Sequence, residues 1–278
     1  MIKRLLRSAV YAMPGTQALW VRLNDAAGRG EPVRFSGWGM TTKTSPPWAD
    51  DADALAKEFM AVNAEVTGRV ASGALRLSQF NSVQDKARQL RELMWRHYLV
   101  FWSARYASRT VAASEINLTE CGVCDGLTAY FAMSAAAGTG SYKAFLYDAW
   151  QAMTGDRLLD SEQSLAGQYA YLSLDNTRRN LAPFAGAATF VKGFVPDSFA
   201  DCTPSTIAWL HIDLNAARPT EAALRVLFDR VLPGGVILFD DYGWPHWHDT
   251  KVAIDRFLGD KRGLLLPMPT GQAMFFKH

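Results

Sequence analysis

The sequence of 278 residues predicts an α/β protein with a Rossmann-like, doubly wound sheet of seven strands, a C-terminal antiparallel hairpin and an N-terminal helical appendage. Two observations support this fold class. After residue 112, short apolar runs alternate with helical patterns, which is typical of a mostly parallel sheet with helices on both faces. Two of the runs, residues 208–215 and 233–243, carry Asp213, Asp240 and Asp241 at strand ends, where ligands bind in open α/β sheets.

A helix is expected between these two runs. Pro219 suits a first helical turn and Glu221 lies near the positive end of the helix dipole. Apolar residues then recur at helical spacing: Ala223, Leu224, Leu227, Phe228 and Val231. Residues 233–235, Pro-Gly-Gly, would end this helix and turn the chain into the second strand. Because such crossovers are right-handed, the three carboxylates should converge at one edge of the sheet.

The other elements follow from the same patterns. Strands are expected at residues 116–121, 142–148 and 188–193, helices at 127–137, 161–183 and 250–258, and a closing hairpin at 264–266 and 273–277. In the N-terminal part, helices are expected at 54–61 and 83–103, after an amphipathic helix at 1–15 and an irregular stretch at 16–50. We therefore divide the chain into an appendage, residues 1–110, and a sheet domain, residues 111–278.

Composition narrows the class of protein. The hydrophobic fraction of 49% and charged fraction of 20% are those of a soluble globular protein, and a net charge of +2 argues against nucleic-acid binding. No stretch is long and apolar enough to span a membrane. Three cysteines cannot form a disulfide framework, so a cytoplasmic location is expected. Homo-oligomerisation is left open.

A glycine-containing turn is expected after the first strand of the sheet domain, between Glu120 and Gly126. It has two glycines, Gly122 and Gly126, and not the three of a dinucleotide fingerprint, so a nicotinamide cofactor is disfavoured. Asp148, at the end of the next strand, is placed to accept hydrogen bonds from ribose hydroxyls. S-adenosylmethionine combines a ribose with a cationic amino-acid group and has no phosphate. A purely structural turn is the alternative.

Carboxylates that crowd together need a cation, a shared proton or hydrogen-bond donors. Mg²⁺ is the natural partner for the oxygen ligands of Asp213, Asp240 and Asp241. The alternative is that Asp240 caps the next helix and Asp241 is solvated. Cys121 and Cys124 are expected to be buried and inert, because a zinc site would need two further ligands.

Five segments, in order, resemble the macrocin O-methyltransferase family: Glu120-x-Gly122-x-x-x-Gly126, residues 146–148, residues 190–198, His211-x-Asp213 with Thr220, and residues 233–243. The resemblance covers about residues 113–278. It implies S-adenosylmethionine-dependent, metal-assisted methylation of sugar hydroxyls. It assigns a divalent cation, Mg²⁺ or another, to Asp213, Asp240 and Asp241. It implies that Glu120, Gly122, Gly126 and Asp148 contact the cofactor. It also implies that Gly193 and Phe194 hold the edge of the adenine ring.

The chain departs from the family pattern at Asn215 and Ala217 after Asp213, and at residues 149–152 after Asp148. The expected function is nevertheless an O-methyltransferase acting on a hydroxyl of a sugar, a glycan or a glycosylated small molecule. Asp213 or His246 would take the proton of that hydroxyl. His246 and His248 are alternatively ligands of a transition metal or simply the wall of a pocket. A non-catalytic scaffold with the same fold is the rival class, and a nicotinamide-dependent oxidoreductase is a weaker third.

Overall fold

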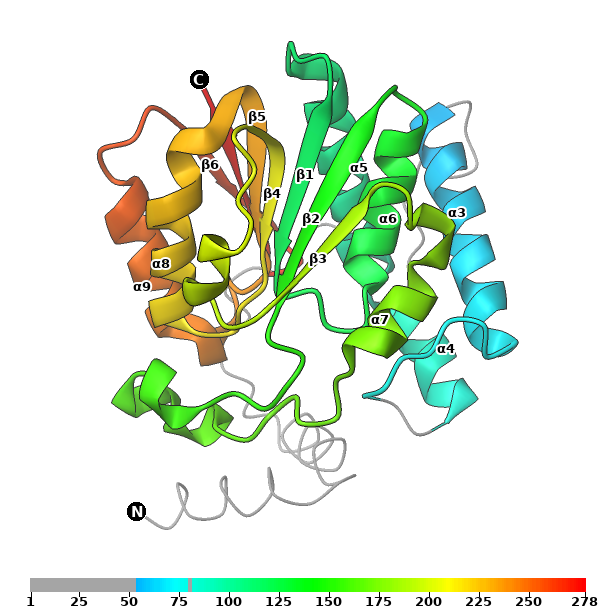
Figure 1. Cartoon of the computed structure of the whole chain (residues 1–278), viewed down its shortest axis with the longest axis horizontal. Helices are drawn as coiled ribbons and strands as arrows, with labels where there is room; N and C mark the ends of the chain where they lie inside the picture. The colour runs from blue at the N-terminus through cyan, green and yellow to red at the C-terminus, as the bar shows by residue number, and fades with distance from the viewer. Residues whose placement is uncertain (1–53, 80–81) are drawn as a thin grey trace, which may run out of the picture. The chain divides into compact units, whose positions relative to one another are not determined.

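A computed structural model describes residues 54–79 and 82–278; the helix predicted at 1–15 and the irregular stretch at 16–50 lie outside the described residues. The sheet has seven strands in the order β3-β2-β1-β4-β5-β7-β6. Strands β1 to β5 are parallel, and β7 pairs antiparallel with both β5 and β6. The predicted doubly wound sheet with a C-terminal hairpin is confirmed (Figure 1).

The strands are β1 (Ile116–Cys121), β2 (Tyr142–Asp148), β3 (Ala188–Lys192), β4 (Ile207–Ile212), β5 (Val231–Phe239), β6 (Gly263–Pro267) and β7 (Ala273–Lys277). The α-helices are α3 (Ala54–Ala71), α4 (Val83–Glu92), α5 (Met94–Thr110), α6 (Leu127–Ala137), α7 (Leu174–Asn180), α8 (Ala217–Leu227) and α9 (His248–Leu258). Of these, β1, α6, β2 and β7 have the predicted bounds. Among the described helices, none combines the length and the apolar character that crossing a membrane requires.

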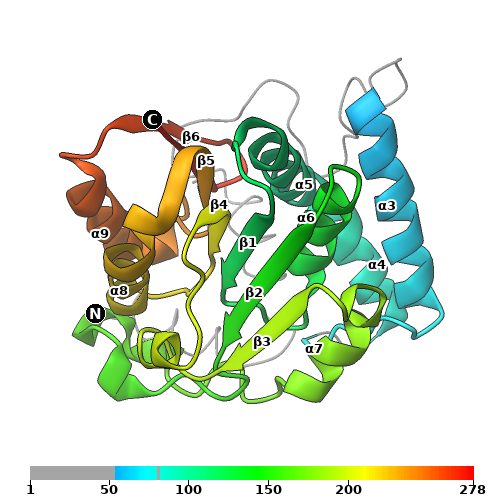
Figure 2. The same ribbon diagram turned by 45° about the horizontal axis from the view of Figure 1, so that its top comes forward.

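Helices cover both faces of the sheet (Figures 1 and 2). Helices α3 to α6 share one hydrophobic core with the sheet, including Phe59, Phe101 and Phe131. Helices α8 and α9 cover the other face through a second core that includes Leu224 and Ile254. Within the described residues, α3 to α5 are therefore part of the helical layer over the sheet, and the boundary predicted at residue 110 stays a prediction.

Three details of the secondary structure differ from prediction. The helix expected at 161–183 is wrong: Gly167 and Tyr169 have φ angles of +86° and +65°, which no α-helix can include, and only the short helices η2 (Asp160–Leu165), α7 and η3 (Ala182–Phe184) form there. The helix expected at 83–103 is two helices separated by Leu93. The Pro-Gly-Gly segment lies inside β5, where the pairing with β4 shifts register, instead of forming a turn before the strand.

Candidate active site

The order of the strands reverses between β1 and β4. The helix after β1, α6, packs on one face of the sheet, and the helix after β4, α8, packs on the other. The carboxyl ends of β1 and β4 therefore border a crevice, the usual ligand site of an open α/β sheet. Every predicted carboxylate ligand lies at this edge: Glu120, Asp148, Asp213, Asp240 and Asp241.

The turn between β1 and α6 packs directly on the end of β4. Gly122 has a φ of +93°, and a Cβ atom added there would lie 1.8 Å from the backbone oxygen of Asp213. The Asp213 amide donates to Cys121 O at 2.9 Å, and the Gly122 amide donates to Tyr147 O at 2.8 Å. Glycine at 122 is thus required by the approach of two backbones, a reason that comes from packing and not from a ligand.

Asp148 fastens the same turn to β2. Its Oδ2 accepts a hydrogen bond from the Cys124 amide and its Oδ1 accepts one from the Trp150 amide, both at 2.7 Å. Burial raises the pKa of Asp148, and the two amide hydrogen bonds oppose that rise. A carboxylate has about four acceptor positions, so both oxygens keep the capacity to accept a further donor.

Gly193 and Phe194 follow β3 at the same edge. The Gly193 amide donates to Asp148 O at 2.9 Å, which places the residue next to the end of β2. The Phe194 ring is covered by the Arg157 guanidinium, whose central carbon lies 4.5 Å from the ring centroid. Arg157 also pairs with Asp197 at 2.6 Å. One face of the ring predicted to hold an adenine is therefore already in contact with a cation.

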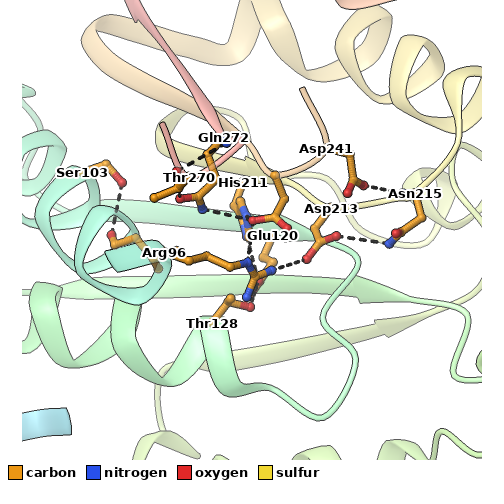
Figure 3. A network of polar contacts seen from close by, with 12 residues as sticks. Arg96, Ser103, Glu120, Thr128, His211, Asp213, Asn215, Asp241, Thr270 and Gln272 are labelled. Carbon is orange, nitrogen blue, oxygen red and sulfur yellow. Dashed lines mark hydrogen bonds and ion pairs between the residues drawn. The ribbon is translucent and has the colours of Figure 1, made fainter. Parts of the chain in front are cut away.

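An arginine contacts two of the predicted metal ligands, and Figure 3 shows it beside one of them, Asp213. Arg96, on α5, donates from Nε to Asp240 Oδ1 and from Nη2 to Asp213 Oδ2, each at 2.8 Å. The same Asp240 oxygen accepts from Gln272 Nε2 at 3.0 Å. The other oxygen of Asp213 accepts from Asn215 Nδ2 at 3.2 Å. Both carboxylates are thus held by donors from other parts of the described chain.

Beneath this pair lies a buried histidine. His211, on β4, is fully buried and its Nδ1 lies 2.8 Å from Glu120 Oε1, which also accepts from the Thr128 hydroxyl. Its Nε2 lies 3.9 Å from Asp240 Oδ1, an ion-pair distance without a hydrogen bond. Glu120, predicted as a cofactor contact, is 1% exposed and joins β1 to β4. Its Oε2 is buried without a hydrogen-bond partner among the described residues.

The three aspartates do not form one donor set. Potential ligand atoms of His211, Asp213 and Asp240 lie within 4.8 Å of one another. Asp241 is outside that group among the described residues, and its Oδ2 accepts from the Asn215 amide at 3.0 Å. Figure 3 shows the Asp241 side chain beside Asn215, away from the guanidinium of Arg96.

The pKa values of Asp213, Asp240 and His211 shift in different directions. Burial and the neighbouring Asp240 raise the pKa of Asp213 to about 7, although Arg96 opposes the rise. Burial would also raise the pKa of Asp240, but Arg96 and His211 outweigh it and hold that pKa below its usual range. Burial lowers the pKa of His211, yet attraction to Asp240 and Glu120 prevails and raises it to about 9. Asp213 is therefore the member of this cluster whose proton affinity suits proton transfer near neutral pH.

His246 lies apart from this cluster, in the exposed short helix η6 (Pro245–Trp247). Its ring contacts Trp247, at 6.1 Å between centroids. Trp247 in turn donates from Nε1 to Asn215 O at 3.1 Å, which ties the loop to the residues after β4. The structure does not bring His246 into the group formed by His211, Asp213 and Asp240.

A cavity of about 450 Å³ lies along the segment between η2 and α7 and is lined by Gln79 and residues 167–171. The Tyr169 and Tyr171 rings are 6.2 Å apart. Burial raises the pKa of the Tyr169 phenol, and the negative charges of Asp213 and Asp241 raise it further. Tyr169 therefore connects this cavity electrostatically with the carboxylates.

Sequence reasoning did not find Arg96, Gln272 or Tyr169. Arg96 has a usable signal, because it is the one Lys, Arg, Asp or Glu in the mostly apolar segment 94–101, and a charged side chain on a buried helix needs a partner. His211, which the sequence offered only as part of the segment His211-x-Asp213, is fully buried.

Comparisons with known proteins find a matching family model and solved structures of similar fold. A family model described as a methyltransferase domain matches residues 119–242. The solved structure of the O-methyltransferase NovP has a TM-score of 0.59 and 18% identity, covering 66% of this chain and 79% of that one. The fold is that of a methyltransferase. CalS11, a calicheamicin methyltransferase, has a TM-score of 0.51 and 17% identity, covering 87% of this chain and 98% of that one. A comparison with proteins of curated function gives no match.

Proposed function

We propose that this chain is an S-adenosylmethionine-dependent O-methyltransferase that acts on a hydroxyl of a sugar or a glycosylated small molecule, as in the macrocin O-methyltransferase family. The observation that carries the proposal is the placement of Asp148 and Asp213 on either side of the glycine-containing turn at the switch point of the sheet. The methyltransferase-domain match and the similarity in fold to NovP and CalS11 support it.

The chain's residues divide between the two substrates. Asp148 accepts hydrogen bonds from ribose hydroxyls, residues 122–126 lie along the cofactor, and Gly193 and Phe194 border the adenine. Glu120 lies at the amino-acid end, and its buried, unpartnered Oε2 fits an ammonium donor. When bound, the cofactor supplies a methyl group on a sulfonium sulfur, which keeps the bonding electron pair as the acceptor oxygen gains the methyl. The sugar acceptor is assigned to the cavity lined by Tyr169 and Tyr171.

Asp213 acts as the general base. The acceptor hydroxyl loses its proton to the Asp213 carboxylate as the new carbon–oxygen bond forms. Arg96 and Asn215 hold that carboxylate in one orientation, since each donates to a different oxygen of it. His246, exposed on its loop, belongs to the rim of the acceptor site. We place the reaction in the cytoplasm, with no nucleic acid as the acceptor.

Calorimetric titration with S-adenosylmethionine tests the proposal. The wild type should bind, and Asp148→Ala should weaken binding by at least about tenfold, because two hydroxyl donors lose their acceptor. Asp260→Ala is the matched control, since its side chain is 79% exposed and distant in the chain from the glycine turn. Absence of heat with the wild type would leave the scaffold as the better description. A bound cofactor justifies a screen of sugar nucleotides and glycosylated compounds with labelled methyl donor.

A further inference from the structure

The position of Arg96 bears on the metal expected at this site. A divalent ion held by Asp213 and Asp240 would need to lie about 2.0–2.6 Å from an oxygen of each carboxylate. In the structure, Arg96 donates to one oxygen of each carboxylate at 2.8 Å. A guanidinium and a divalent ion between the same two oxygens would repel each other at close range. The arrangement therefore does not fit a metal ion that bridges these two oxygens while Arg96 is in place.

The hydrogen bonds of the potential metal ligands support the same conclusion. Asp240 Oδ1 accepts from both Arg96 and Gln272, which uses both of its lone pairs. His211, the third potential ligand, directs Nδ1 to Glu120 and is fully buried. The Asp241 carboxylate is held by the Asn215 amide. Each of the three aspartates thus has a protein donor that a metal would have to displace, whereas His211 Nε2 is buried without a hydrogen-bond partner among the described residues, 3.9 Å from Asp240 Oδ1.

Arg96 is also held firmly. It lies on α5 and is followed by His97, Tyr98 and Leu99, all buried in the core that α5 shares with α6 and the sheet. Its side chain is 19% exposed and that of Asp213 is 17% exposed. A planar guanidinium with donors on two edges can bridge two carboxylates at once, and it stays charged at every physiological pH. These are the properties that a built-in replacement for a metal cation requires.

We propose that the Arg96 guanidinium takes the place of the divalent cation between Asp213 and Asp240, so that methyl transfer by this chain needs no metal. The catalytic part of this inference rests on the proposed function. Arg96 is a positioning residue: it orients the carboxylate of Asp213, the general base, and neutralises Asp240 beside it. The metal-binding part concerns the free protein and can be tested without any substrate.

The test is a titration of the full chain with Mn²⁺, followed by calorimetry and by the electron paramagnetic resonance signal of the free ion. The wild type should show no site at millimolar Mn²⁺. Arg96→Met removes the charge at similar length and should create a site bound at least about 10²-fold more tightly, because two carboxylates lose their cation. Adding Asp213→Asn to that variant should abolish the new site. Arg91→Met, an exposed arginine on α4, is the matched control and should behave as the wild type.

Micromolar binding of Mn²⁺ by the wild type would overturn the inference, and this measurement needs no variant to fold. Where methylation is detectable, addition of EDTA should leave the wild-type rate unchanged, and a loss of activity that Mg²⁺ restores would equally overturn it. Arg96→Lys keeps the positive charge but cannot donate to both carboxylates from two edges of one planar group. This variant should lower kcat more than it raises KM and should not gain a metal site. A protein that binds neither Mn²⁺ nor S-adenosylmethionine would refute the proposed function while leaving the assignment of Arg96 intact.

Discussion

Replacement of Gly122 by alanine tests the packing on which the whole site depends. The added methyl would lie 1.8 Å from the backbone oxygen of Asp213, which is a contact with backbone and cannot be relieved by a side-chain rotation. The φ of +93° adds conformational strain of about 1–2 kcal/mol for a residue with a Cβ. Overpacking contributes about 1–3 kcal/mol more. We therefore expect Gly122→Ala to lower the free energy of unfolding by about 2–5 kcal/mol.

The variant Gly73→Ala separates the conformational strain from the overpacking. Gly73 also has a positive φ, +77°, but a Cβ added there meets no atom within 4 Å. It should therefore show only the strain, and the difference between the two variants measures the contact with Asp213. Urea unfolding of both variants gives that difference, and the melting temperature should differ by about 2–4 °C for each kcal/mol. If the two variants unfold at the same urea concentration, the turn does not pack on β4 as described.

Two further predictions concern acid stability and catalysis. Burial and the adjacent Arg96 lower the pKa of His97 to about 3, so only the unfolded chain takes up this proton as the pH falls below about 6.5. Between pH 6 and 4, the free energy of unfolding of the wild type should therefore fall by about 1.4 kcal/mol more per pH unit than that of His97→Phe. If urea unfolding gives the two proteins the same dependence of stability on pH, this prediction is wrong. Asp213→Asn should lower kcat by about 10²-fold or more with a smaller effect on KM, because the general base is lost while the size and shape of the side chain are kept. An unchanged kcat in a methyl-transfer assay would exclude Asp213 as the base.

The fold was largely predictable because its signals are local. Strands β1, β2 and β4 are short segments of six or seven residues in which apolar side chains recur, and glycines or polar residues follow them closely. The segment 161–183 misled the prediction because Gly167 and Tyr169 adopt positive φ angles, which interrupt the expected helix. A single tyrosine in the left-handed region leaves no sequence signal that a pattern of hydrophobicity can detect.

The candidate site was predictable only in part, for a reason of distance along the chain. Topology brings the ends of β1, β4 and β5 together, so the carboxylates could be placed at one edge from their strands alone. Arg96 precedes Asp213 by 117 residues and Asp240 by 144, and it comes from a helix whose position over the sheet no local pattern specifies. The sequence thus revealed that the acids needed a cation, but not which cation the fold provides.

The cluster is best understood as one electrostatic unit that connects the two halves of the proposed site. Glu120 contacts His211, and His211 lies at ion-pair distance from Asp240. Arg96 joins Asp240 to Asp213. Through these contacts, the end of β1 below the proposed cofactor is coupled to the base that faces the proposed acceptor. Because each buried charge is stabilised by its neighbours, removal of any one should change the proton affinity of the others, and the effects of paired substitutions should not add.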